Sequence, residues 1–332
     1  MPASTRIEWR AGCTLLLLCC LAGCAGPSQL AAVSAGLPPQ AELTATPFFP
    51  QTEHQCGPAA LATVLGAAGL KVEPAALATE VYLPGRAGSL QPELAAAVRA
   101  RGLLAYQLGP ELGEILAEVA TDRPVLILQR LGAGPWPGWH YAVVIGYDQQ
   151  AGQVLLRSGT KERLVMRAAL FESTWERGGR WALVALQPGT VPARPDLTRY
   201  MQAAAALETT PNPAAARAAY EAAAGLWPHE PLPRLGLGNV AAARGDWREA
   251  ESWYRAVLRD EPAQAAALNN RAEALNRIGC ADAARWSLQQ GMSSVAADDP
   301  LRPALEQTAL ELAGRAGEEA VEPADCAQFT GR

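Results

Sequence analysis

The sequence predicts an α+β domain with an antiparallel sheet, followed by an all-α domain. In the first part, segments with the apolar period of helices come first, and short apolar runs typical of strands follow them. Beyond about residue 195 the chain is rich in alanine and helical in pattern, and similar residues recur 34 positions apart. The 332 residues are enough for two ordinary domains.

The composition fits a chain that folds, and it excludes two kinds of partner. Hydrophobic residues make up 49% of the chain and charged residues 18%. The formal net charge is −5, and Lys71 and Lys161 are the only lysines. Because no basic run is present, we expect no nucleic-acid partner. No Cys-x-x-Cys or His-x-x-x-His cluster is present either, so we expect no metal and no other cofactor.

The first 23 residues resemble a bacterial lipoprotein signal peptide. Arg6 and Arg10 precede a short apolar run, and a Leu-Ala-Gly-Cys sequence ends at Cys24. The run is too short to span a bilayer permanently. The resemblance implies cleavage after residue 23 and a lipid on Cys24 that anchors the chain to a membrane. Because Ala25 rather than Asp follows, it also implies the outer membrane, facing the periplasm. The alternative is an ordinary signal peptide in which Cys24 is incidental.

Residues 24–46, rich in Ala, Pro, Ser and Gly, are expected to form a tether between the lipid and the folded domain.

The remaining cysteines have different expected fates. Cleavage and lipidation would leave Cys56, Cys280 and Cys326 out of seven cysteines. In an oxidising compartment Cys280 and Cys326 are the expected disulfide pair, since both lie in the C-terminal part, although spacing alone does not show proximity. Cys56 would then be a free thiol.

The elements of the first domain, residues 47–190, follow from local patterns. Pro58 and the spacing of the apolar residues after it predict a helix that begins at Cys56 and ends near Gly69. Ser89 is expected to cap another helix, which Gly102 ends. Further helices are predicted at 74–81, 112–120 and 170–175. Strands are predicted at 103–108, 124–128, 140–147, 154–157, 164–166 and 181–186.

Cys56 and His140 are the candidate catalytic pair. The partial positive charge at a helix N-terminus favours the thiolate of a cysteine, which is the nucleophilic form. Such a nucleophile needs a base within hydrogen-bond reach, and imidazole is the usual one. Of the three histidines, His54 lies on the approach loop and His229 in the repeat region, which leaves His140. The competing interpretation of Cys56 is a buried structural residue.

Two segments resemble the bacteriocin-processing, double-glycine peptidases, which are papain-like cysteine peptidases. The first is Gln51 with Cys-Gly-Pro-Ala from Cys56, and the second is Trp-His-Tyr-Ala-Val-Val-Ile-Gly-Tyr-Asp around His140. The resemblance covers about residues 47–190. It implies a papain-like fold, a peptide or protein substrate, Cys56 as nucleophile and His140 as base. It also implies a glutamine that binds the oxyanion; Gln51 fits that role best, and Gln55 is the competing candidate.

The chain departs from that family at the group that orients the histidine. The family usually has an Asp on the strand after the His strand, and here that strand reads Val-Leu-Leu-Arg-Ser-Gly-Thr from residue 154. Asp148 lies eight residues along an extended strand from His140, roughly 26 Å away. Pairing Tyr147 with Val154 would place residue 161 opposite His140. The orienting group is therefore expected between about Arg157 and Glu162. Alignment with the family implies Ser158, with Thr160 and Glu162 as the next candidates.

Residues 188–195 are expected to be a linker. The second domain, residues 195–332, resembles a tetratricopeptide array. Pro228 and Pro262 share the 34-residue offset, as do Tyr220 and Tyr254, and the segment from Gly245 resembles the second helix of such a repeat. Repeats are expected at 196–229 and 230–263, with a degenerate one at 264–297 and a capping helix at 303–312. The alternative is a generic helical bundle. Such arrays form a groove that binds a protein partner and carry no chemistry of their own.

The sequence therefore predicts a lipid-anchored periplasmic cysteine peptidase with a protein-interaction domain. Two alternatives stay open. In one, the peptidase-like domain binds peptides without cutting them, an interpretation favoured by the missing Asp. In the other, the same Cys–His pair acts as an amidase or acyltransferase on cell-wall peptide. The chain carries no transporter segments of the kind to which double-glycine peptidases are commonly fused, so the leader-peptide substrate is not part of the prediction.

Overall fold

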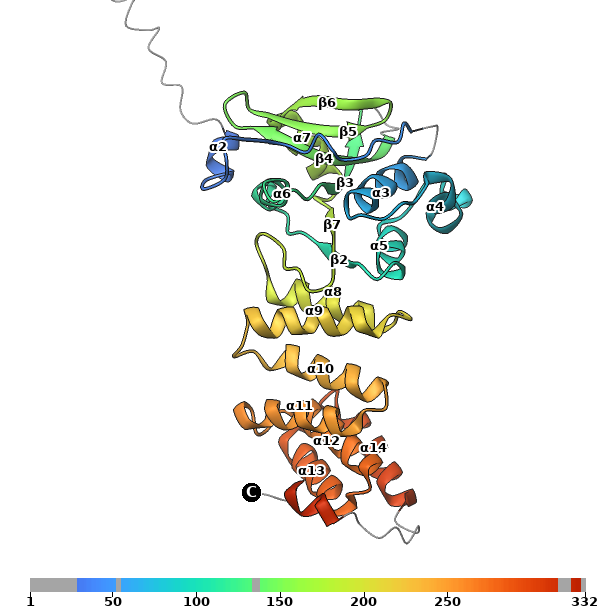
Figure 1. The fold of residues 1–332 in the computed structure, drawn as a ribbon, viewed down its shortest axis with the longest axis vertical. Helices are drawn as coiled ribbons and strands as arrows, with labels where there is room; N and C mark the ends of the chain where they lie inside the picture. The colour runs from blue at the N-terminus through green and yellow to red at the C-terminus, as the bar shows by residue number, and fades with distance from the viewer. Residues whose placement is uncertain (1–28, 52–54, 133–137, 316–323, 330–332) are drawn as a thin grey trace, which may run out of the picture.

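The computed structural model describes residues 29–51, 55–132, 138–315 and 324–329. A sheet flanked by helices forms one end of the molecule, and a stack of helices forms the other (Figure 1). The signal peptide, Cys24, the first part of the tether and His54 lie outside the described residues. Among the residues described, no helix has both the length and the apolar character needed to cross a membrane.

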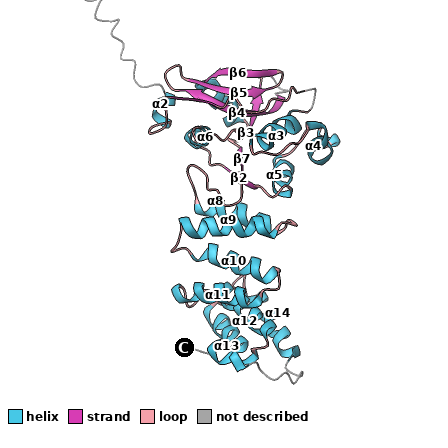
Figure 2. Ribbon diagram, in the orientation of Figure 1, coloured by secondary structure: helices cyan, strands magenta, loops and turns pink. Residues whose placement is uncertain are grey.

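The sheet has seven strands, and each pair of neighbours is antiparallel, which confirms the predicted α+β class. The strand order is β2-β7-β3-β4-β5-β6, and the short β1 pairs with β4 outside this path. All the strands lie in the N-terminal part (Figure 2). The strands are β1 (Gln40–Glu42), β2 (Leu104–Gln107), β3 (Val125–Leu131), β4 (Gly138–Asp148), β5 (Gln153–Ser158), β6 (Lys161–Arg167) and β7 (Ala182–Leu186).

Helices cover both faces of the sheet, because alternate residues of its central strands are apolar on both sides. In β4, Tyr141 and Val143 belong to one buried cluster and Ala142 and Val144 to the other. The first face carries α3 (Cys56–Ala67), α4 (Pro74–Val81) and α5 (Gln91–Ala100). The second carries α6 (Leu112–Val119) and α7 (Ala168–Arg177). The predicted helices are therefore present, with ends shifted by one or a few residues.

The folded part begins earlier than the sequence indicated. Residues 24–46 were expected to be a tether, but α2 (Gln29–Val33) and β1 pack on the sheet. Leu30 is buried in the core, and the Leu43 N–H donates to the Ile145 carbonyl at 2.7 Å. Leu30 and Leu43 are isolated apolar residues in a segment rich in Ala and Pro, so they form no helical or strand period. Their positions depend on packing against distant residues, which the sequence does not reveal.

The predicted Ser89 cap of α5 is wrong. Leu90 occupies the N-cap position, and its side chain makes no capping hydrogen bond. The Ser89 hydroxyl has no hydrogen-bond partner in the described structure, whereas the Ser89 carbonyl accepts a hydrogen bond from the Tyr141 hydroxyl at 3.2 Å. Tertiary packing against β4 therefore decides the position of Ser89, rather than the local preference of serine for helix starts.

The C-terminal part is helical throughout its described length. Three helix pairs occupy the three predicted repeat intervals, and α14 lies where the capping helix was expected. The tetratricopeptide assignment itself stays a prediction. The elements are α8 (Leu197–Glu208), α9 (Pro213–Leu226), α10 (Pro231–Ala243), α11 (Trp247–Asp260), α12 (Ala265–Ile278), α13 (Ala281–Ser294), α14 (Arg302–Arg315) and the short 3₁₀ helix η3 (Ala324–Phe329).

The 34-residue spacing of Tyr220 and Tyr254 has a packing reason. Both rings lie against α10, at Gly236 and Gly238 respectively. A Cβ atom at Gly236 would lie 2.4 Å from the Tyr220 ring, and one at Gly238 would lie 2.3 Å from the Tyr254 ring. The two glycines therefore let buried tyrosines of neighbouring helices approach the α10 backbone.

The two parts share one hydrophobic core, although residues 188–195 were expected to be a linker. The buried cluster on the second face of the sheet, which contains α6 and α7, continues from Tyr106 in β2 to Tyr200 in α8 and Leu237 in α10. The segment between them is also tied down, since the Ala193 N–H donates to the buried Glu118 carboxylate at 2.6 Å. Burial raises the pKa of Glu118, and the nearby Arg123 opposes that rise.

Cys280 and Cys326 form a disulfide, as the sequence suggested. The bond joins the start of α13 to η3, two segments separated by 46 positions. Within the described residues Cys56 is the free cysteine.

Candidate active site

Cys56 is the first residue of α3, and its neighbours Gly57 and Pro58 are buried. The glycine allows a close approach, because a Cβ atom at position 57 would lie 2.7 Å from the Ser89 Cβ and 3.6 Å from the Tyr141 ring. Proline in this first turn removes one of the backbone N–H groups that would have no partner within the helix. The Cys-Gly-Pro sequence thus holds the start of α3 tightly against β4 and leaves Cys56 half-buried.

The thiol of Cys56 lies near Tyr141, the residue that follows His140 in β4. The pKa of the Tyr141 hydroxyl is raised mainly by burial, and further by the negative charges of Cys56 and Glu93 close to it. Cys56 also packs at the edge of the cluster that contains Tyr141. The helix start and the histidine strand therefore meet at this point of the sheet.

His140 is held by Ser158, the first of the three orienting candidates. The His140 Nε2 atom lies 2.9 Å from the Ser158 hydroxyl oxygen, and Ser158 is buried with 8% of its surface exposed. Tyr147 pairs with Val154 as predicted. A bulge between Val144 and Gly146 then shifts the pairs that lie nearer to His140 by one residue. The expected placement of residue 161 opposite His140 is therefore wrong, whereas Ser158 lies within hydrogen-bond distance of His140 and its orienting role stays a prediction.

The other two orienting candidates do not contact His140 among the described residues. Thr160 is exposed in the turn after β5. The Glu162 carboxylate is 69% exposed and lies 3.9 Å from Arg157. Arg157 itself is buried and donates hydrogen bonds to the carbonyls of Thr44, Thr46 and Glu162 at 3.2, 2.8 and 2.5 Å. It fastens the segment that precedes the site to the β5–β6 hairpin.

The surroundings of His140 favour the neutral imidazole. Burial lowers its pKa below the ordinary value of 6.5. Because Ser158 occupies Nε2, the nitrogen left to face a thiol is Nδ1, which accepts a proton when Nε2 carries the hydrogen. No hydrogen bond joins Cys56 to His140 in the part of the chain described, and such contacts often form only when substrate is bound.

Gln51 lies where β5 separates from β4. Its backbone N–H donates to the Gly159 carbonyl at 3.0 Å, and its Nε2 donates to the Tyr141 carbonyl at 3.4 Å. The competing candidate, Gln55, is exposed at the N-cap position of α3. Gln51 is thus the glutamine whose side-chain amide reaches the strand that carries His140.

Sequence reasoning missed the residues on the rim of the site. Trp139 precedes His140 and is 60% exposed, and the Arg130 guanidinium carbon lies 5.6 Å from the centre of its ring. Tyr141 and Arg157 were assigned only to strands, although they fix the start of α3 and the approach segment. The available signal was an aromatic residue on each side of His140 in the sequence.

The lowered pKa of His140 predicts how the reactivity of Cys56 depends on pH. As the pH falls, His140 becomes protonated and can no longer accept the thiol proton, so reactivity is lost. Because burial disfavours the imidazolium, we expect the midpoint of this loss below 6.5. The alkylation rate of Cys56 by iodoacetamide, followed across pH, measures it. A single midpoint near that of a free thiol, about 8.5, would contradict the prediction.

Residues 43–182 match the family model described as "Peptidase_C39 like family". The N-terminal part of the chain is therefore a C39-like peptidase domain. Its match begins in the segment fastened by Arg157 and ends at the start of β7. A search among curated proteins finds no match to this chain.

Two solved structures are similar to part of the chain. One is a protein described as a C39-like peptidase from Bacillus anthracis, with 21% identity and a TM-score of 0.37, covering 44% of this chain and 97% of that one. The other is the peptidase domain of Streptococcus ComA, described as a bifunctional ABC transporter involved in a quorum-sensing pathway. It has 20% identity and a TM-score of 0.33, covering 43% of this chain and 99% of that one.

Proposed function

We propose that this chain, with a C39-like peptidase domain as its N-terminal part, is a cysteine peptidase that hydrolyses peptide bonds through Cys56 and His140. The observation that carries the proposal is the contact between His140 Nε2 and the buried Ser158 hydroxyl at 2.9 Å. This contact directs one ring nitrogen away from the thiol and leaves Nδ1 for it. Tyr141, the residue after His140, belongs to the cluster against which the half-buried Cys56 packs, so the histidine strand and the start of α3 meet, as a nucleophile and its base require.

The residues divide the reaction between them. Nδ1 of His140 takes the proton of Cys56, and the thiolate sulfur attacks the carbonyl carbon of the scissile bond. The Gln51 side-chain amide and the Cys56 backbone N–H donate hydrogen bonds to the oxyanion that forms. His140 then gives the proton to the leaving amine, and the C–N bond breaks. Water, deprotonated by the same nitrogen, hydrolyses the thioester and releases the sulfur.

A second candidate function is peptide binding without cleavage. The observation that favours it is the neutral Ser158 in contact with His140, because a hydroxyl does not stabilise an imidazolium by charge as a carboxylate does. Both functions require a peptide in the same place, so they differ only in the reactivity of Cys56.

We also propose that a lipid on Cys24 anchors the chain to the outer membrane, facing the periplasm, and that the helical part is a tetratricopeptide domain that binds a protein. The support for the anchor is the Leu-Ala-Gly-Cys sequence after an apolar run. The disulfide between Cys280 and Cys326 fits an oxidising compartment. The support for the repeats is the 34-residue period and the three helix pairs that follow it.

Covalent labelling distinguishes the two candidate functions. A peptidyl acyloxymethyl ketone, which requires an activated thiolate, is expected to label Cys56 in the purified chain and to leave Cys56→Ala unlabelled, as located by mass spectrometry. The matched control is Ala265→Cys in the Cys56→Ala background, because position 265 is also the half-buried first residue of a helix, α12. Equal labelling rates at positions 56 and 265 would overturn the peptidase proposal and leave the binding role.

A further inference from the structure

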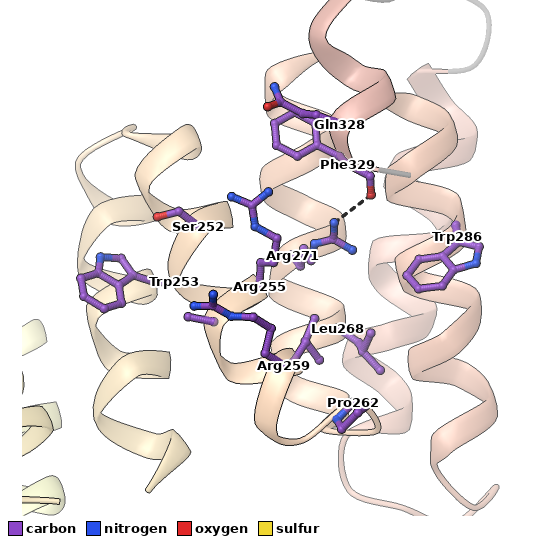
Figure 3. Close-up of a pocket in the computed structure, with 12 residues that line it drawn as sticks. Ser252, Trp253, Arg255, Arg259, Pro262, Leu268, Arg271, Trp286, Gln328 and Phe329 are labelled. Carbon is purple, nitrogen blue, oxygen red and sulfur yellow. Dashed lines mark hydrogen bonds between the residues drawn. The ribbon is translucent and has the colours of Figure 1, made fainter. Parts of the chain in front are cut away.

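A cavity of about 750 Å³ opens in the helical part, at the end of the molecule opposite the sheet (Figure 1). Residues of α11 form one wall, Trp286 of α13 forms the other, and α12 lies between them (Figure 3). The chain's own residues Gln328 and Phe329, from η3, cover one end. We call this cavity the distal groove.

The distal groove is positively charged, in a chain whose net charge is −5. Arg255, Arg259 and Arg271 line it, and no acidic side chain is among its described lining residues. Glu251, beneath the groove, lies 3.0 Å from Arg271 and 3.7 Å from Arg255. Arg259 is exposed and makes no hydrogen bond or ion pair with any described residue. Its guanidinium is therefore available to an external anion.

The walls of the distal groove are aromatic. Trp253 and Trp286 stand on opposite sides of it (Figure 3). Trp286 is 46% exposed, which is unusual for so large an apolar side chain. Exposed aromatic rings beside arginines are typical of surfaces that bind other chains, because both side chains give large contact areas.

The chain's own η3 makes two contacts with the arginines of the groove. Arg271 donates a hydrogen bond to the Phe329 carbonyl at 2.9 Å (Figure 3), and the Arg255 guanidinium carbon lies 5.9 Å from the centre of the Phe329 ring. The Cys280–Cys326 disulfide holds η3 in this place. A main-chain carbonyl and an aromatic ring are thus already bound by two of the three arginines, while Arg259 has no such partner.

We propose that the distal groove docks an acidic peptide segment that carries an aromatic residue. One carboxylate of the segment pairs with Arg259, and its aromatic side chain packs on Trp286, beside the Phe329 already in place. The net charge of the chain disfavours a long polyanion such as a nucleic acid, whereas a short acidic segment contacts only the groove. This inference rests on the interaction role proposed for the helical part, and it specifies the chemistry of the partner.

Fluorescence anisotropy of the whole chain tests the proposal. The probe is a fluorescein-labelled peptide of glutamate, glycine and one phenylalanine, and we expect saturable binding that weakens as salt is added. Arg259→Gln is expected to raise the Kd about tenfold, the value of one charge-assisted hydrogen bond. Trp286→Ala is expected to weaken binding as well. The matched control, Arg86→Gln, removes another exposed arginine from the other end of the molecule and is expected to leave the Kd unchanged.

Three outcomes would overturn the proposal: no saturable binding, equal binding of a peptide with glutamine in place of glutamate, or the same Kd for Arg259→Gln and the unaltered chain. Circular dichroism of each variant shows that it is folded, since both replaced side chains are exposed. Labelling of Cys56 in the same samples reports separately on the peptidase proposal. Equal binding of the glutamine peptide would retain the general interaction role and remove only the acidic preference.

Discussion

Replacing His140 by alanine is expected to lower the rate at which Cys56 reacts with a peptide-like electrophile by about 10²–10⁴-fold at neutral pH. The reason is that His140 presents Nδ1 as a proton acceptor, since its Nε2 contacts Ser158. Without the imidazole, the thiol must ionise into water, and its reactivity then follows its own ionisation. The measurement is the second-order rate constant for labelling, compared between His140→Ala and the unaltered chain.

Two further variants separate a base from a structural histidine. His229→Ala, which removes an imidazole from the loop after α9, is expected to leave the labelling rate unchanged. Ser158→Ala is expected to lower it by about 3–10-fold, the value of one neutral hydrogen bond, and Ser158→Asp is expected to raise it, because a carboxylate stabilises the imidazolium. If His140→Ala and His229→Ala react alike, His140 is not the base.

Replacing Arg271 by leucine is expected to reduce the free energy of unfolding of the helical part by about 3–5 kcal/mol. Glu251 is 1% exposed, and Arg271, itself buried, approaches it to 3.0 Å. The substitution leaves a buried carboxylate with only Arg255, at 3.7 Å, to balance it. It also removes the hydrogen bond to the Phe329 carbonyl. Urea unfolding followed by circular dichroism measures the change.

The matched control is Arg285→Leu, which breaks an exposed pair with Asp282 and is expected to cost less than about 1 kcal/mol. The double variant of Glu251→Leu and Arg271→Leu is expected to recover much of the loss, because no unpaired buried charge remains. A loss for Arg271→Leu no larger than that for Arg285→Leu would show that the buried pair contributes little.

Helix and strand positions could be predicted where the cause is local. The start of α3 follows from proline in its first turn and from apolar residues spaced at one helical face, and Cys56 is the first residue of that helix as expected. The strand that carries His140 follows from a continuous apolar run, and β4 is buried on both faces. Such patterns need no knowledge of the rest of the fold.

The features that the sequence did not predict all depend on partners far along the chain. β1 forms on the last residues of β4, beyond those that pair with β3. The position of Ser89 follows from Tyr141, and residues 188–195 are held through Glu118. The bulge near Ile145 changes the pairing register of the hairpin, and no residue of the turn predicts where that bulge lies. Local propensity is too weak to decide such places against tertiary contacts.

The residues proposed for the site came from the sequence, whereas the residues that support them did not. Ser158 was chosen by alignment with the family, and it lies within hydrogen-bond distance of His140. Thr160 and Glu162 stayed open because a hairpin register is uncertain by one or two residues until the bulge is known. The fastening role of Arg157 depends on carbonyls of the distant residues Thr44 and Thr46, which no local pattern connects to it.

The core shared by the sheet and helices α8 to α10 has a consequence for substrate choice. Tyr106, Tyr200 and Leu237 pack in one cluster, and a second cluster joins α10 to α11 and α12, so packed helices of the described structure connect the sheet to the distal groove. A partner docked in that groove is therefore held at a fixed distance from the Cys56 thiol. The proposed enzyme would select substrates by the distance between their docking segment and their cleavable bond. Only a chain whose cleavable bond lies far enough from its docking segment would gain effective concentration at Cys56, while shorter chains would bind without being cut.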